Sequence, residues 1–216
     1  MADFDPKQPY NDLPLLPPPL EQIETTDILK ACIGARVALA ELKQAAELIP
    51  NSAVLVNALP LLEARASSEI ENIVTTTDKL FEYADLAAER ADAATKEALR
   101  YRSALYEGTK MVRRRMLTTD MAIQICSTVK GIELDLRSEP GTTLKNRLTG
   151  DVIYTPPVGQ KRLQEKLDNW AEFMHKHVEI DPLVRLAIQH YQFEAIHPFA
   201  DGNGRTGRIL NILFLV

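Results

Sequence analysis

The segment HPFADGNGRTGRILNILFLV, residues 197–216, combines a turn-forming stretch with the apolar spacing of a buried helix. Gly202, Gly204 and Gly207 remove side chains from the turn that leads into this helix. Backbone N–H groups can then approach an anion closely, because those that open a helix have no intrahelical acceptor. The segment therefore predicts a phosphate cradle at the start of a helix.

Charged and titratable side chains of the same segment fit that cradle. Arg205 and Arg208 are three residues apart, so we expect both guanidinium groups to project from one face and bind polyphosphate oxygens. Asp201 would repel phosphate unless a cation such as Mg²⁺ lay between them. His197 can take a proton near neutral pH. Together they predict transfer of a phosphorus group to a hydroxyl.

Each of these features also has a structural interpretation. A GNG sequence is a common turn, a histidine before proline often ends a helix, and arginines early in a helix can simply be solvated. Singly, each feature is more often structural, whereas the twelve-residue set HPFADGNGRTGR favours function. The segment lacks a GxxxxGK[ST] pattern, so the predicted cradle differs from a P-loop.

The net charge and composition of the whole chain limit its function further. The net charge is −5 over 216 residues, and a general nucleic-acid binder needs a basic surface. No apolar run is long enough to span a bilayer, and the N-terminus lacks the regions of a signal peptide. We expect a cytoplasmic protein without nucleic-acid or membrane partners. Cys32 and Cys126 lack metal-ligand spacing and are expected to be small buried residues.

Residues 1–20 and 21–115 are predicted to form a proline-rich arm and an N-terminal helical region. The arm is expected to be extended, and it either lies on its own domain or recruits an SH3-type partner. Amphipathic spacing predicts the helices that follow. They are expected over residues 21–49, 54–65 and 78–116, with a separate helix start at SSEIENIVTT, residues 67–76.

Residues 116–216 are predicted to form the core that carries the glycine-rich segment. Thr118 is expected to precede a helix over residues 121–134, and Asp181 followed by proline is expected to begin another. Between them, turn residues at Pro140-Gly141 and Thr149-Gly150, with short β-prone pieces around the second turn, predict a small hairpin.

The chain ends at Val216, inside the apolar run. A helix cut at this point would expose apolar side chains, which usually marks an interaction site or a truncated chain. Leu210, Leu213 and Phe214 are therefore expected to have few partners. We expect a core truncated at its C-terminus, either as a fragment or as a subunit completed by association, for instance in a homo-oligomer.

HPFADGNGRTGR matches the signature HxFx[DE]GNGRxxR of the Fic family at every defined position, and the chain resembles that family. YNDLPLLPPP, SSEIENI and IYTPPVG also resemble parts of larger Fic proteins. The resemblance implies a mainly α fold, with a Fic-type helical core, a β-hairpin flap and an N-terminal helical region. It implies transfer of AMP from ATP to a Ser, Thr or Tyr hydroxyl of a target protein, with release of pyrophosphate.

The resemblance also implies roles for individual residues. His197 would be the general base, and Asp201 would hold Mg²⁺ against the phosphates of ATP. Arg205 would contact the phosphate chain, Arg208 the γ-phosphate, and Phe199 would anchor the loop. The implied nucleotide-binding residues are Gly202, Asn203, Gly204, Arg205, Thr206, Gly207 and Arg208, of which the first three would form the anion hole.

The predicted hairpin, around residues 146–155, resembles the family's flap. By that resemblance it would dock a target segment through main-chain pairing. The implied docking residues are Leu148, Thr149, Gly150, Asp151, Val152, Ile153 and Tyr154.

A second motif concerns regulation. Ser67, Glu71 and Asn72 fit the family's inhibitory pattern [ST]xxxE[GN], which implies that Glu71 pairs with Arg208 and occupies the fork that the γ-phosphate requires. Ser68 and Glu71 also fit a capping box at a helix start. With the Fic signature in the same chain, the inhibitory interpretation is favoured.

Other functions are compatible with the same loop. The signature fixes a diphosphate clamp, so transfer of phosphate or another nucleotide, or removal of AMP with Glu71 positioning water, stays open. A regulatory module that binds ATP without turnover and a helical scaffold with an incidental loop are the alternatives that are not enzymes.

Overall fold

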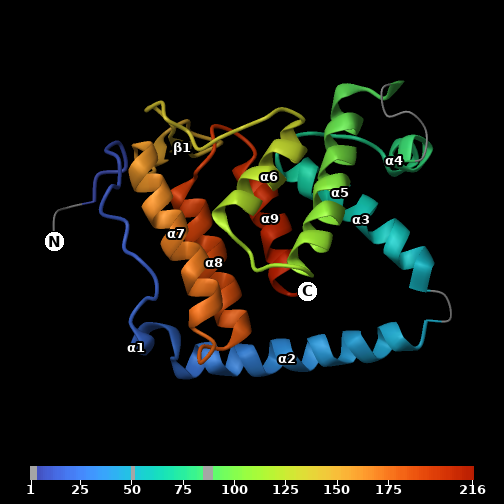
Figure 1. The fold of residues 1–216 in the computed structure, drawn as a ribbon, viewed down its shortest axis with the longest axis horizontal. Coiled ribbons are helices and arrows are strands. Elements are labelled where there is room, and N and C mark those ends of the chain that lie inside the picture. Colours follow the sequence, from blue (N-terminus) through green and yellow to red (C-terminus); the bar gives the residue numbers. More distant parts are fainter. Residues whose placement is uncertain (1–3, 50–51, 85–89) are drawn as a thin grey trace.

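The computed structural model describes residues 4–49, 52–84 and 90–216, and most of them are helical (Figure 1). Strands β1 and β2 form one small antiparallel hairpin. The predicted mainly α fold with a β-hairpin is confirmed. The elements are α1 (Leu20–Ile23), α2 (Thr26–Glu47), α3 (Ser52–Ile70), α4 (Thr77–Ala84), α5 (Ala93–Val112), α6 (Thr119–Lys130), β1 (Leu144–Lys145), β2 (Val152–Tyr154), α7 (Gln160–Lys176), α8 (Pro182–Ile196) and α9 (Asn203–Phe214).

Helix α9, which follows the glycine-rich loop, packs against α3, α5, α6 and α8 (Figure 1). Leu210 and Leu213 are buried, so the expectation that they have few partners is wrong. The reason is that α5, from the N-terminal half, covers the same helix. Its Gly108 leaves room for Leu213, whose Cδ1 atom would lie 2.6 Å from a Cβ at that position. Phe214 is half-buried, whereas Val216 is exposed.

A row of buried aromatic rings supports the loop between α8 and α9. The Trp170 ring lies 5.5 Å from that of Phe193, which lies 6.3 Å from that of Phe199. The indole N–H of Trp170 donates to the Gln189 carbonyl oxygen at 2.9 Å, so its polar atom is also satisfied. Phe199 is buried beneath the loop, as predicted.

The proline-rich arm lies along α7 and α8 (Figure 1). Leu13 and Leu16 are buried. The Asn169 side chain of α7 accepts from the backbone N–H of Leu16 at 2.8 Å and donates to its carbonyl at 2.9 Å. The Gln192 side chain of α8 donates to the Pro14 carbonyl at 2.8 Å. The interpretation that the arm lies on its own domain is confirmed.

Helix α3 corrects the prediction of a separate helix start at residue 67. It runs without interruption to Ile70, so Ser67 and Ser68 lie in its last turn. Nothing between residues 65 and 67 interrupts the helix. Asn72 adopts φ 61°, in the left-handed region that commonly ends a helix.

The predicted capping residues at two helix starts are confirmed, whereas the predicted end of α6 is wrong. Thr118 and Asp181 accept from backbone N–H groups at the starts of α6 and α8, as expected. Gly131, at φ 70°, ends α6 before the predicted residue 134. The helical stretches predicted over 78–116 are separate helices, since Asp92 caps a new helix, α5, through the Thr95 N–H.

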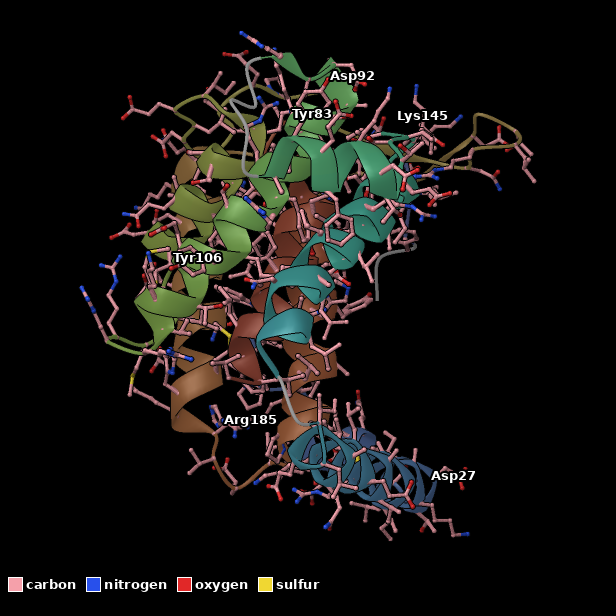
Figure 2. The ribbon with its side chains drawn as sticks, turned by 90° about the vertical axis from the view of Figure 1, so that its right-hand side faces the viewer. Asp27, Tyr83, Asp92, Tyr106, Lys145 and Arg185 are labelled. Atoms are coloured by element: carbon pink, nitrogen blue, oxygen red, sulfur yellow. The ribbon has the colours of Figure 1, made fainter. Side chains whose placement is uncertain are left out.

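Helix α2 has the expected apolar spacing, yet none of its residues is buried. Figure 2 shows Asp27 on this helix at the edge of the molecule. Cys32 is only half-buried, which corrects its prediction, whereas Cys126 is buried as expected. In the part of the chain that the structure describes, no helix combines the length and apolar character that a membrane crossing requires.

Candidate functional site

Two residues with positive φ bracket the glycine-rich loop. His197 ends α8 at φ 49°, and Gly202 precedes α9 at φ 89°. Between them, the buried Asn203 side chain accepts from the Phe199 N–H at 2.9 Å and donates to the Phe199 carbonyl at 2.7 Å. The amide side chain therefore fixes the shape of the loop, and a ligand would meet backbone N–H groups instead.

The predicted anion cradle would consist of the N–H groups that open α9, those of Asn203, Gly204 and Arg205. They have no intrahelical acceptors and lie at the positive end of the helix dipole. The Gly202 N–H, which was predicted to belong to the cradle, donates to Asp201 Oδ1 at 2.6 Å instead. A Cβ atom on Gly204 would lie 2.5 Å from Glu71 Oε1. The absence of a side chain at residue 204 thus lets the carboxylate of Glu71, which directly follows α3, approach the start of α9.

The structure brings the predicted inhibitory residues onto Arg208. Arg208 Nε donates to Ser67 Oγ at 2.6 Å, and Nη2 donates to the Ser67 carbonyl and to Glu71 Oε1, each at 3.0 Å. Asn72 turns the chain immediately after Glu71. The capping-box interpretation is wrong, because Ser68 and Glu71 end a helix and the Glu71 carboxylate binds an arginine.

Arg205 does not share a ligand-facing surface with Arg208, which corrects the predicted double clamp. Its side chain is 2% exposed and pairs with Glu97 of α5, whereas Arg208 pairs with Glu71, which directly follows α3. Glu97 on α5 and Glu71 after α3 thus bind the two guanidinium groups on different sides of α9. Thr206 and Gly207 are buried as well, and a Cβ atom on Gly207 would lie 2.5 Å from Glu194 Oε1 of α8. Of the seven predicted nucleotide-binding residues, Gly204 and Arg208 are half-buried and the other five are buried.

Asp201 is the metal ligand that the sequence predicts, and its side chain is 68% exposed. Partial burial alone would raise its pKa, but the hydrogen bond and charge of Lys130 outweigh that effect and lower it. In the described residues, no group of three or more His, Cys, Asp or Glu could hold a metal. One ionised carboxylate beside an anion cradle fits Mg²⁺ when phosphate oxygens and water supply the other ligands.

His197 is half-buried, and its Nδ1 atom is buried with no hydrogen-bond partner among the described residues. Burial lowers the pKa of His197. Its backbone carbonyl accepts from Arg137 Nε at 2.7 Å, and the same guanidinium donates to the Pro157 and Ile196 carbonyls. The imidazole is therefore neutral at neutral pH, and Arg137 fixes the position of the His197 backbone.

The predicted flap is fixed at its base and exposed at its tip. Leu144 pairs with Tyr154 across the hairpin, and the Tyr154 hydroxyl donates to the Ala195 carbonyl at 2.9 Å. Leu148, at the tip, is 96% exposed. The hairpin that carries Lys145 extends to the side of the molecule (Figure 2). Of the other predicted docking residues, Thr149, Gly150, Asp151 and Ile153 are exposed, and Val152 and Tyr154 are half-buried.

Several site residues were not predicted. Arg137, Glu97 and Lys130 carry no motif, and their long-range partners give the sequence no local signal. Glu194, on α8, was also missed. Burial raises the pKa of Glu194 to about 7, although the charge of Arg208 acts in the opposite direction. Its Oε1 atom has no hydrogen-bond partner among the described residues.

Comparison with family models assigns nearly the whole chain. The Fic/DOC family N-terminal model matches residues 29–110, and the Fic/DOC family model matches residues 117–215.

Curated relatives match over shorter stretches. Protein adenylyltransferase fic-1 of Caenorhabditis elegans is 39% identical over 62 residues, 28% of this chain and 12% of that protein. Protein adenylyltransferase Fic of Drosophila melanogaster is 40% identical over 73 residues, 33% and 15% of the two chains. A probable protein adenylyltransferase of Aquifex aeolicus is 43% identical over 61 residues, 28% and 18%. The matched segments thus span between 12% and 18% of these relatives.

Solved structures share the fold. A Fic-domain-containing signaling protein of Bacteroides thetaiotaomicron has a TM-score of 0.67 at 20% identity, over 83% of this chain and 71% of that chain. Fic-1 of C. elegans has a TM-score of 0.65 at 21% identity, over 91% of this chain and 60% of that chain. The predicted Fic-type helical architecture is confirmed.

The raised pKa of Glu194 predicts a pH-dependent stability. The folded protein keeps a proton that the unfolded chain loses as the pH rises from about 4.5 to about 7, so stability falls over that range. Glu194→Gln removes this loss. The stabilisation by Glu194→Gln, relative to wild type, should be about 2 kcal/mol larger at pH 8 than at pH 5. Urea unfolding at both pH values measures it, and equal changes at pH 5 and pH 8 would refute the assignment.

Proposed function

Because the chain belongs to the Fic/DOC family, we propose that it is a protein adenylyltransferase inhibited by its own Glu71. It transfers AMP from ATP to a hydroxyl group of a target protein and releases pyrophosphate. The observation that carries the proposal is the contact of Glu71 with Arg208 beside the N–H groups that open α9. The names of the curated relatives support the transfer of AMP.

Each task in the proposed reaction is assigned to particular residues of this chain. The N–H groups of Asn203, Gly204 and Arg205 bind phosphate oxygens of ATP. The target hydroxyl attacks the α-phosphorus, the bond to pyrophosphate breaks, and the neutral His197 imidazole takes the hydroxyl proton. Asp201 would hold Mg²⁺, which would neutralise phosphate charge when bound.

Inhibition follows from competition for one guanidinium. Arg208 gives its donors to acceptors at the end of α3, namely Ser67 in the last turn and Glu71 directly after it. A γ-phosphate needs the same donors, and the carboxylate is already in place at a high effective concentration. ATP then binds without the γ-phosphate contact that orients the α-phosphorus for attack.

The target protein docks on the flap in this proposal. The exposed turn and the short strands β1 and β2 offer backbone groups to an extended segment of the target. Ser, Thr and Tyr are the acceptor side chains with a hydroxyl.

A second candidate function is removal of AMP from a modified protein. The Glu71 side chain is 33% exposed beside the anion cradle. A carboxylate in that place can orient an attacking water molecule. An AMP-modified protein incubated with wild type and with Glu71→Gln tests it, since only wild type should release AMP.

Glu71→Gly is expected to raise AMP transfer by about 10- to 100-fold, because a hydrogen bond between charged groups no longer holds Arg208. Transfer is measured from ATP labelled at the α-phosphate, with ATP labelled at the γ-phosphate as a separate arm. Glu69→Gly is the matched control, since Glu69 lies on the same turn and pairs with Arg65 instead. It should leave transfer at the wild-type level.

Three results of that experiment would contradict the proposal. Equal transfer by wild type and Glu71→Gly would remove the inhibitory role. ATP binding without turnover in Glu71→Gly would favour a regulatory binding module, and label transferred only from the γ-phosphate would indicate a kinase.

His197→Ala in the Glu71→Gly background should lower AMP transfer by about 10²- to 10⁴-fold, the range for loss of a general base. Affinity for ATP should stay unchanged, because the cradle and Arg208 are intact. His177→Ala, a histidine that follows α7, is the control for a general effect of removing an imidazole. Retained turnover in His197→Ala would refute the assignment of the base.

The pH profile gives an independent check. A general base must be neutral, so activity should rise as the pH rises through the pKa of His197. Because burial lowers that pKa from its ordinary 6.5, the acid limb of kcat/KM for Glu71→Gly should lie below pH 6.5. An acid limb at or above 6.5 would be inconsistent with this environment.

A further inference from the structure

Arg147, in the turn of the hairpin, contacts the inhibitory segment. Its Nη2 atom donates to the Ile70 carbonyl at 3.1 Å and lies 3.8 Å from Glu71 Oε2. The other carboxylate oxygen, Oε1, accepts from Arg208. Glu71 therefore lies between two guanidinium groups, one from the helix start that would bind nucleotide and one from the flap.

The contact with Ile70 acts on the end of α3. Ile70 is the last residue of this helix, so its carbonyl lacks an intrahelical donor and lies at the negative end of the helix dipole. A cation that donates there stabilises the last turn. That turn carries Ser67, which also binds Arg208. Arg147 thus supports the whole set of acceptors that engages Arg208.

Hydrogen bonds within the tip of the hairpin hold Arg147 in its turn. The Asn146 N–H donates to the Asp151 carbonyl at 2.8 Å, and the Asn146 side chain accepts from the Leu148 N–H at 2.8 Å. Arg147 reaches α3 from this turn, and the next residue, Leu148, is almost fully exposed. Displacement of the turn by a docked segment would therefore move Arg147 as well.

We propose that Arg147 is a positioning residue that couples the flap to the inhibitory turn, so that flap displacement weakens the hold of Glu71 on Arg208. This inference rests on the proposed function, since it assigns a second contact to the same inhibition. By linkage, release of Glu71 also loosens the flap. Docking of a target segment and binding of the γ-phosphate then favour each other.

The expected change in ATP affinity on removal of the Arg147 side chain is small. The Arg147 side chain is 67% exposed, and exposed ion pairs contribute little because water screens them. Loss of its contacts should strengthen ATP binding by about 2- to 5-fold. ADP lacks the γ-phosphate, so its affinity should not change. This difference separates positioning of Glu71 from a general change in stability.

Calorimetric titration with ATP and with ADP, in the presence of Mg²⁺, tests the proposal. The variants are Arg147→Ala, Glu71→Gly and the double variant, with wild type as reference. Arg147→Ala should tighten ATP only, and it should add nothing in the Glu71→Gly background, because its effect passes through Glu71. Lys145→Ala removes the same charge from the same hairpin and should match wild type.

A second readout is hydrogen exchange of the backbone amides in residues 144–154. Glu71→Gly should exchange faster there than wild type, since Arg147 loses one of its two partners. Unchanged exchange would mean that the flap does not sense Glu71, and it would overturn the coupling.

The binding results separate failure of this inference from failure of the proposed function. If Glu71→Gly tightens ATP but Arg147→Ala does not, the coupling is wrong and the inhibition stands. If Arg147→Ala tightens ATP equally in both backgrounds, Arg147 acts independently of Glu71, and the coupling is again wrong. If Glu71→Gly does not tighten ATP, both the inhibition and the coupling fail.

Discussion

The guanidinium group of Arg208 cannot bind two anions through the same donors, and the organisation of the site depends on this constraint. Its Nε and Nη2 donors go to Ser67 and Glu71. These acceptors are available because Asn72 ends α3 at that point and because Gly204 carries no side chain that would block the carboxylate. In the proposed function, the anion site and its internal competitor would thus come from the start of one helix and the end of another.

Two ion pairs connect the N-terminal half of the chain to the helix that follows the glycine-rich loop. Each arginine of the signature pairs with a carboxylate that precedes residue 116: Arg205 with Glu97 of α5, and Arg208 with Glu71, which directly follows α3. The Arg205 pair is buried, so it fixes the position of α9 rather than binding a ligand. The Arg208 pair is partly exposed, which leaves it accessible to a phosphate. The difference in burial therefore distinguishes the structural Arg205–Glu97 pair from the Arg208–Glu71 pair, in which a phosphate could replace the carboxylate.

The sequence predicted features that local chemistry determines, and it failed where distant contacts decide. Thr118 and Asp181 cap helices as expected, because capping involves neighbouring residues. The pairing of Glu71 with Arg208 followed from a family pattern. The prediction that Arg205 faces a ligand beside Arg208 was wrong. The spacing of the two arginines gives only their relative direction on a helix, and the partner that buries Arg205, Glu97, lies 108 residues away in the sequence. Helix α2 has an apolar stripe, but spacing does not say whether another element covers it.

A crystal structure of the wild-type protein with Mg²⁺ and a non-hydrolysable ATP analogue would test the central claim most directly. The account predicts that Glu71 still contacts Arg208 and that the γ-phosphate lies elsewhere. A γ-phosphate bound to Arg208 while the carboxylate keeps its place on the same donors would show that the two anions do not compete, and would contradict it.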